Sequence, residues 1–332
     1  MKNFFFGLFI LFLGLSACST DFQLEGEWSD IPVVYGFVSI QDTAHYIRVQ
    51  RAFLEPGGNA NEIAQIPDSL YYNDITVEFI RENGDAYQLS RVDGNLEGYP
   101  REDGAFATSP NYLYKIKANE INLQGGELLT LRINRGDDLE PVTAETRLIG
   151  EISMSETSPS SPLNLEYTRF INTVWQVSLD AQIFDIKYIF NYKESLADDP
   201  STLVNKSVTW DFSNELRRDP TSSSVSVFAR PQGISFYQFL GGAIEENPNV
   251  NRIFDGMDIQ VTGSGQEIVD LINIARANSG ITSSQVVPVY SNISEGIGFF
   301  SSRSVGKRTN LTLNFSSQDS LENGIYTRNL NF

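Results

Sequence analysis

Residues 75–92 (ITVEFIRENGDAYQLSRV) decide the fold of the first half, because two strand-like runs flank a turn. Asn83-Gly84 suits the positive φ angles of a type I′ turn, so residues 75–81 are predicted to pair with residues 86–92 as a β-hairpin. Further strand-like runs lie at residues 33–38, 45–53, 113–117, 128–133 and 142–149. Short strands with turns every ~8–12 residues predict a mainly β fold, with an N-terminal Ig-like β-sandwich over residues 31–150.

The second half of the chain is predicted to be a separate, antiparallel β-rich domain over residues 151–332. A Ser- and Pro-rich stretch at residues 151–164 is typical of a linker or a long inter-domain loop, which places the domain boundary near Gly150. Two inserted helices are expected near residues 234–246 and 265–278, each with one apolar stripe that packs on the sheet. Strands are expected at residues 173–179, 183–192, 207–212, 224–230, 286–290, 298–302, 310–315 and 324–330.

The N-terminus has the pattern of an export signal. After Met1-Lys2-Asn3 an apolar run covers residues 4–15, which as a helix of about 12 residues spans only ~18 Å of a ~30 Å hydrocarbon core. Residues 1–17 are therefore predicted to be a cleaved signal peptide. Leu15-Ser16-Ala17-Cys18 resembles a bacterial lipobox, which implies acylation of Cys18, for example with palmitate, and leaves residues 18–30 as a lipidated tether.

Cysteine usage and charge agree with this interpretation. Cys18 is the single cysteine, so it has no disulfide partner in an oxidising compartment. The formal charge is -18, from 42 acidic and 24 basic residues, which excludes a nucleic-acid-binding role because phosphates would be repelled. The same acidity disfavours contact of the protein surface with anionic lipid, so the membrane contact is expected through the acyl chains alone.

No set of catalytic, cofactor-binding or metal-binding residues is predicted. His45 is the single histidine and is expected to point outward from an alternating strand. Because the chain has no second histidine, neither a histidine-based catalytic relay nor a zinc site with a histidine pair is expected. The acidic pairs Asp137-Asp138 and Asp198-Asp199 are expected to be solvated turns, with a loosely held Ca²⁺ as the alternative. We therefore expect a protein that is not an enzyme and needs no cofactor.

Three short motifs resemble the O-glycosylation acceptor of Bacteroidota proteins. They centre on Thr43, Ser69 and Ser320, each preceded by an aspartate and followed by alanine or leucine. Each motif is equally typical of a turn.

Several blocks together resemble one lipoprotein family. They are residues 290–303 (YSNISEGIGFFSSR), residues 33–36 (VVYG), residues 143–146 (TAET) and the lipobox. These are similar to a Bacteroidota outer-membrane lipoprotein family that is catalogued as a domain of unknown function and is often encoded beside TonB-dependent receptors. The resemblance implies a lipid-anchored outer-membrane location, on the cell surface or in the periplasmic leaflet.

The loop in the first of these blocks has two interpretations. Its notable residues are Asn292, Gly296, Gly298 and Phe299. The glycines allow a bulge or a close backbone approach, and the phenylalanine anchors the strand that follows. The loop either closes the core of the second domain or forms an edge that faces a partner.

The leading functional hypothesis is a non-enzymatic accessory or partner-binding subunit of an outer-membrane β-barrel transport or export machine. The alternative is a surface carbohydrate- or peptide-binding lipoprotein for nutrient capture, with an aromatic platform of Tyr71, Tyr72, Tyr99, Tyr112 and Trp210. A third hypothesis is a glycan-acting enzyme that uses a pair of carboxylates.

Overall fold

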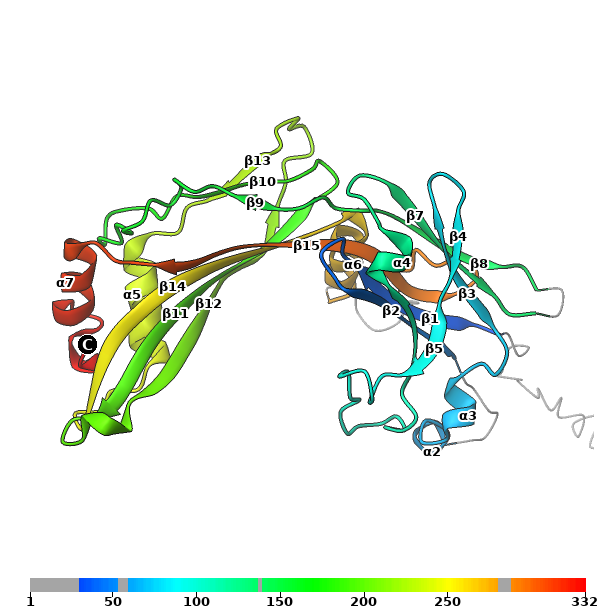
Figure 1. Cartoon of the computed structure of the whole chain (residues 1–332), viewed down its shortest axis with the longest axis horizontal. Helices are drawn as coiled ribbons and strands as arrows, with labels where there is room; N and C mark the ends of the chain where they lie inside the picture. The colour runs from blue at the N-terminus through cyan, green and yellow to red at the C-terminus, as the bar shows by residue number, and fades with distance from the viewer. Residues whose placement is uncertain (1–29, 53–58, 137–138, 280–287) are drawn as a thin grey trace, which may run out of the picture.

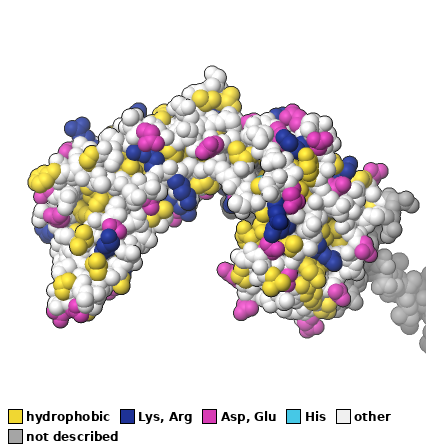
Figure 2. Space-filling model, viewed as in Figure 1, with side chains coloured by type: hydrophobic (Ala, Val, Ile, Leu, Met, Phe, Trp, Pro, Cys, Tyr) yellow, Lys and Arg dark blue, Asp and Glu magenta, His cyan; other side chains and the backbone are white. Residues whose placement is uncertain are grey.

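The protein consists of two β lobes that share one sheet. A computed structural model describes residues 30–52, 59–136, 139–279 and 288–332. The lobes lie side by side and are joined by the long strand β15 (Figure 1), and in the space-filling view they form an arch (Figure 2). Within the described residues, no helix is both long enough and apolar enough to cross a membrane.

Strand β15 (Ile297–Leu311) belongs to both lobes. Its first part runs parallel to β1 (Pro32–Val38), with Val33 opposite Ile297 and Val38 opposite Ser302. Its second part runs antiparallel to β14 (Val250–Ser264), from the pair Ser264 and Arg303 to the pair Met257 and Leu311. The result is one eight-stranded sheet with the order β12-β11-β14-β15-β1-β2-β6-β5.

The first lobe is the predicted β-sandwich. One sheet contains the first part of β15, β1, β2 (Ala44–Arg51), β6 (Tyr112–Lys117) and β5 (Ser90–Asp93). The facing sheet contains β4 (Ala86–Gln88), β3 (Thr76–Arg81), β7 (Leu128–Asn134) and β8 (Val142–Arg147). Apolar side chains that alternate along these strands form a single core between the sheets. Three short helices lie in the connections: α2 (Ala60–Ile63), α3 (Pro67–Leu70) and α4 (Ala118–Ile121).

The hairpin that was predicted at residues 75–92 forms only in part. β3 pairs with β4 around the predicted turn, and Gly84 has a φ of 92°. Asn83 does not have a positive φ, so the turn is not the type I′ turn that the Asn-Gly sequence predicts. The chain then leaves this sheet, because residues 90–93 form β5 and pair with β6 in the facing sheet. The second predicted strand of the hairpin is therefore two strands, one in each layer of the sandwich.

The second lobe is built on long antiparallel strands. β11 (Ile183–Leu196) pairs with β12 (Val204–Arg217) on one side and with β14 on the other. A small sheet of β13 (Ser226–Ala229), β10 (Thr173–Gln176) and β9 (Ser153–Met154) covers part of one face. α5 (Gly233–Ala243) packs Phe236 and Leu240 into the same core, and α6 (Gln266–Ser279) follows β14. These two helices confirm the helical segments expected near residues 234–246 and 265–278.

The end of the chain differs from the prediction. Strands were expected at residues 310–315 and 324–330, but these residues form the end of β15, α7 (Phe315–Asn323) and the short helix η2 (Arg328–Leu330). Asn314 precedes α7 as its N-cap: its side chain accepts a hydrogen bond from the Ser317 amide, which stabilises the first turn. Residues 288–290 are not in a strand, and the rest of the strand predicted there lies outside the described residues.

The division at residue 150 also needs correction. Residues 297–302, which were assigned to the second domain, pair with β1, and Phe300 is fully buried in the first core. Residues 151–164, which were predicted to be a linker or a long inter-domain loop, are held against the second lobe. Leu163 is buried in the second core, and its amide donates to the Thr312 carbonyl. The first lobe is thus completed by a segment from the far end of the sequence.

Candidate functional site

His45 is buried, in contrast to the sequence-based prediction. It is 1% exposed, and its ring centroid lies 6.3 Å from that of Phe79 in the first core. The reason is the period of a strand, since residue 45 shares its face with Ile47 and Val49. Neither ring nitrogen has a hydrogen-bond partner in the described part of the chain, and burial lowers the pKa of His45 from its usual 6.5. A neutral, enclosed imidazole of this kind is a core residue and not a catalytic base.

The candidate acidic pairs do not form a metal site among the described residues. Asp199 caps the short helix η1 (Pro200–Thr202) by accepting a hydrogen bond from the Ser201 amide, so it acts in a turn. Hydrogen bonds from Ser201 lower the pKa of the Asp199 carboxyl. Asp137 and Asp138 lie outside the described residues. In the described part of the chain, no three His, Cys, Asp or Glu side chains come together in an arrangement that could hold a metal ion.

The predicted modification sites have different surroundings. Cys18 lies outside the described residues. Thr43 is exposed in the turn between β1 and β2, whereas Ser69 is half-buried in α3. Ser320 is half-buried in α7, and its hydroxyl donates to the Ser316 carbonyl. Of the three motifs, the one at Thr43 therefore has the exposed turn that a modifying enzyme needs.

The loop at residues 292–299 closes the first lobe and not the second. The Asn292 side chain donates a hydrogen bond to the Phe300 carbonyl at 2.7 Å and accepts one from the Phe300 amide at 2.9 Å. Gly298 has a φ of 122°, and a methyl group added there would lie 1.9 Å from the Val34 carbonyl oxygen. A methyl group added at Gly296 would lie 2.8 Å from the Pro32 carbonyl oxygen. These three residues are needed for the close approach of β15 to β1.

Phe299 differs from the other residues of this loop because it lies on the outer face of the sheet. Its ring contacts Tyr35 and Phe37 of β1 at centroid distances of 5.5 and 5.0 Å. Phe299 is half-buried, and Tyr35 is exposed. Of the four loop residues, Phe299 is the one whose side chain extends onto a surface.

Four of the five aromatic residues proposed as a platform lie near one end of the first lobe. Tyr71 is buried and packs against the half-buried Tyr112, whereas Tyr99 is exposed and packs on Tyr46. Tyr72 is half-buried and donates to Asp30. The fifth residue, Trp210, packs against the core of the second lobe. The five rings therefore do not form one open face, and the four rings of the first lobe lie at one end of the sandwich.

At this end, an ordered loop connects the adjacent strands β5 and β6. Asn111 is fully buried and holds the loop through its side chain, which donates to the Tyr99 carbonyl at 2.8 Å and accepts from Arg48 at 2.8 Å. Asn95 donates to the Thr108 carbonyl at 2.9 Å and so joins the two sides of the loop. A loop of this length without regular structure is uncommon in a compact domain and is frequently functional.

A second segment packs beside this loop. The Ala107 amide donates to the Ala64 carbonyl at 2.8 Å, and the Gln65 side chain donates to the carbonyls of Gly104 and Ala105. We call residues 59–70 and 94–111 together the loop ridge. Their contacts hold the two segments in one orientation, as Figure 1 shows for α2, α3 and the neighbouring loop at the lower end of the lobe.

The loop ridge exposes large apolar side chains. Leu96 is 87% exposed, Tyr99 is 53%, Ile66 is 50% and Phe106 is 46%. Hydrophobic side chains are visible along the lower end of this lobe in Figure 2, between acidic ones. Single exposed apolar residues are ordinary, but several of them on an ordered loop are typical of a site that binds another molecule.

Charged groups support the base of the loop ridge. Glu97 forms an ion pair with Lys115 and accepts a hydrogen bond from the Tyr46 hydroxyl at 3.0 Å. The hydrogen bond from Lys115 lowers the pKa of the Glu97 carboxyl, so this carboxylate is charged at neutral pH. Desolvation and the contact with Glu97 raise the pKa of Tyr46. The loop is therefore fixed from β2 and β6 by side chains that keep one protonation state at neutral pH.

Sequence reasoning found Tyr99 but not Leu96, Phe106 or Ile66. A signal was present, because residues 94–111 (GNLEGYPREDGAFATSPN) contain no strand or helix period yet carry three large apolar residues. In a flexible loop such residues would be unusual, so an ordered and exposed loop was the structure to expect.

The strand pairing and the loop ridge define the molecule as a two-lobed β-sandwich protein with an apolar surface at one end. No family model matches the chain, and no curated protein matches it. Among solved structures, a two-domain fibronectin type-III segment from chicken tenascin is similar at 9% identity and a TM-score of 0.21, with 86% of this chain and 100% of that chain covered. At that TM-score the likeness carries no argument about function.

Proposed function

We propose that this chain is a lipid-anchored outer-membrane protein that works as a non-enzymatic partner-binding subunit of a β-barrel transport or export machine. The exposure of Leu96, Tyr99 and Phe106 on an ordered loop is the observation that carries the binding role. Aromatic and other large apolar side chains in a fixed position lose little entropy on binding and are typical anchors of protein interfaces. The lipobox at residues 15–18 supports the anchor.

The carboxylate-dependent enzyme has less support. Asp30 and Glu295 line a hollow of 410 Å³ beside β1, but Asp30 is bound by Arg135 at 2.8 Å. A carboxylate whose oxygen is held by an arginine is not free to reach a substrate as a general acid or a nucleophile. The ion pair explains Asp30 as part of the structure.

The partner-binding role is tested by changing the loop ridge alone. Leu96→Asp places a charge on the most exposed apolar residue of the ridge without removing a core contact. We expect the variant to recover about one tenth or less of the β-barrel protein that co-purifies with the wild type from detergent-solubilised outer membranes. Phe315→Asp is the matched control, because Phe315 is 88% exposed on α7 in the other lobe.

Two outcomes would contradict the partner-binding role. One is that no β-barrel protein travels with the wild type, and the other is that both variants retain it equally. Unchanged circular dichroism and an unchanged melting temperature confirm that the variants are folded.

The anchor is tested at Cys18. Replacing its thiol by the hydroxyl of serine removes the atom that is acylated, so Cys18→Ser is expected to lose incorporation of labelled palmitate and to appear in the soluble fraction. The measurement is labelling followed by fractionation, with Leu96→Asp as the control that keeps both label and membrane association. A Cys18→Ser protein that remains labelled and membrane-bound contradicts the lipid anchor.

A further inference from the structure

A second exposed surface lies on the other lobe, where two stretches of chain form an antiparallel ribbon. Thr173 is opposite Ala229 in the pairing of β10 with β13, so Asn172 lies opposite Arg230 just beyond these strands. On the inner face, Thr173 and Ala229 are buried in the second core. On the outer face, Asn172 and Arg230 are exposed, and Phe228 beside them is 56% exposed. Alternation thus places an amide, a guanidinium and an aromatic ring side by side.

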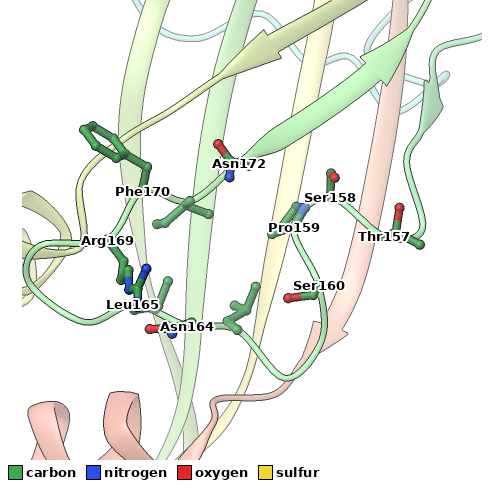
Figure 3. A pocket seen from close by; sticks show the side chains of 11 residues that line it. Thr157, Ser158, Pro159, Ser160, Asn164, Leu165, Arg169, Phe170 and Asn172 are labelled. Atoms are coloured by element: carbon green, nitrogen blue, oxygen red, sulfur yellow. The ribbon is translucent and has the colours of Figure 1, made fainter.

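Two hollows adjoin this face of the ribbon. Each has a volume of 360 Å³, and both are lined by Arg169, Phe170 and Asn172. The first hollow extends under the segment at residues 157–165, and Figure 3 shows Ser158, Ser160 and Asn164 around it with Arg169 beside Asn164. The second hollow is completed by Thr168 and Arg230. We call the two hollows together the linker groove.

The wall of the linker groove is held in place from β15. The Arg308 guanidinium donates to the Ser155 carbonyl at 3.0 Å and also to the Pro159 carbonyl. The amide of Leu163 donates to the Thr312 carbonyl at 2.7 Å. These contacts give the Ser- and Pro-rich segment a defined position beside the ribbon.

The charge of the linker groove is opposite to that of the whole protein. Arg230 stacks on Phe228 with 4.8 Å between the guanidinium carbon and the ring centroid, and among the described residues no carboxylate forms an ion pair with it. Arg169 is 3.7 Å from Glu166, but the two side chains are 64% and 38% exposed, and a solvent-screened pair of this kind is weak. Among the residues that the structure describes, no carboxylate lines either hollow. A chain with a formal charge of -18 therefore presents two arginines together at a depression.

The remaining lining groups are suited to hydroxyl-rich ligands. Apart from the arginines, the polar side chains are hydroxyls and amides, namely those of Thr157, Ser158, Ser160, Asn164, Thr168 and Asn172. Phe170 is 50% exposed and borders both hollows, so its side chain is accessible to a partner. Hydroxyls and amides both donate and accept hydrogen bonds, and guanidinium groups bind carboxylates in a bidentate manner.

We propose that the linker groove binds an acidic oligosaccharide, one whose sugar rings carry carboxylates. Arg169 and Arg230 bind the carboxylates, Asn172 and the serine hydroxyls bind the sugar hydroxyls, and Phe170 packs against the C–H face of a ring. The ligand is bound without a covalent step. This site is separate from the loop ridge, so it adds a second binding activity in the other lobe and does not depend on the first.

The proposal is tested by calorimetric titration of the full-length protein in detergent with tri-galacturonate, with neutral galactotriose as the comparison. We expect saturable binding of the acidic probe and at least about tenfold weaker binding of the neutral one, because charge-assisted hydrogen bonds are lost. Arg230→Gln and Phe170→Ala are each expected to weaken binding of tri-galacturonate about tenfold. Arg303→Gln is the matched control, because Arg303 is an exposed arginine stacked on Phe37 in the first lobe.

Several outcomes overturn this proposal. They are no saturable binding of tri-galacturonate, equal binding of the neutral trisaccharide, or an equal loss in the Arg303→Gln variant. A fourth is an acidic peptide that competes with tri-galacturonate at equal affinity, since the site would then recognise charge and not a sugar. The loop ridge can fail its own test while this one succeeds, because the two use different residues and different probes.

Discussion

The loop ridge and the linker groove are both exposed and both contain aromatic side chains, but they differ in their polar groups. In the loop ridge, the side chains of Asn111 and Asn95 donate hydrogen bonds to backbone carbonyls of the same loop, and the apolar side chains face solvent. In the linker groove, Arg230 and Asn172 lie on the outer face of a ribbon beside a hollow. A surface whose polar groups are satisfied internally binds by burying area, whereas one with open donors selects a ligand by its chemistry.

One chain thus carries two surfaces of different kinds. The first lobe shows an apolar projection, which suits a complementary surface on a large partner. The second lobe shows a depression with two positive charges, which suits a smaller anionic ligand. The two surfaces lie in different lobes, and three sets of variants test how independent they are.

The largest effect is expected from removing a core ring in one lobe. Phe300→Ala deletes a fully buried ring that packs 5.8 Å from Phe79, and it is expected to reduce the free energy of unfolding by about 3–5 kcal/mol. Although Phe300 is far along the chain, the amides of β3 and β7 in the first lobe should lose the most protection. Hydrogen exchange followed by mass spectrometry measures this, together with urea unfolding.

The matched variant for this experiment is Phe236→Ala. Phe236 is also fully buried, but it lies in α5 in the core of the second lobe. Its loss should expose the amides of β11 and α5 first. If both variants deprotect the same amides, the two lobes do not open separately, and their two surfaces are not independent.

An intermediate effect is expected at the base of the loop ridge. Asn111→Ala leaves the Arg48 guanidinium and the Tyr99 carbonyl without the partner that they now share, at a cost of about 1–3 kcal/mol. Exchange of amides at residues 94–111 should rise, and recovery of the partner of the loop ridge should fall. Binding of tri-galacturonate is the internal control, and it should not change. A parallel loss of both activities would mean that the surfaces are coupled.

The smallest effect is a dependence on pH that is confined to the first lobe. Burial lowers the folded-state pKa of His45 below 6.5, so below that value the unfolded chain binds more protons than the folded one. The contribution of His45 to stability is therefore complete above pH 6.5 and is lost as the pH falls through the folded-state pKa. We expect urea midpoints reported by amides of the first lobe to fall with acidification.

His45→Leu is the test of this cause. It replaces two unpaired buried nitrogens by carbon of similar size, so it should remove the acid dependence and leave stability at neutral pH equal or higher. An unchanged acid dependence in the variant would place its source elsewhere in the lobe.

The sequence predicted the strands of the first lobe because their apolar residues alternate with period two. The same rule places His45 with Ile47 and Val49, so its burial could have been predicted from its position. The division of residues 86–93 into β4 and β5 was harder to predict, since the alternation of apolar and polar residues does not show which sheet a strand joins. The caps of α7 were visible as Asn314 and Gly324, but residues 315–323 are mostly polar and show no apolar stripe.

The two surfaces were harder to predict because both depend on tertiary contacts. Tyr99 is exposed, and Tyr71 is buried, for reasons that lie in the packing of the two loops and not in their local sequence. The arginines of the linker groove are far apart in sequence and meet only through the pairing of residues near β10 and β13. The Ser- and Pro-rich segment was predicted to be a linker or a long inter-domain loop, and its composition gives no indication that β15 fixes it.

Strand β15 has a consequence for how the molecule is made. During synthesis the chain emerges amino end first, yet the first lobe lacks an inner strand of its sandwich until residues 297–302 arrive. Until then β1 has a bare edge, and the nascent lobe is exposed to wrong pairing with other chains. If translation stops before residue 297, neither the first lobe nor the shared sheet is complete. We therefore expect chaperones to bind the nascent chain until almost all of it has been synthesised.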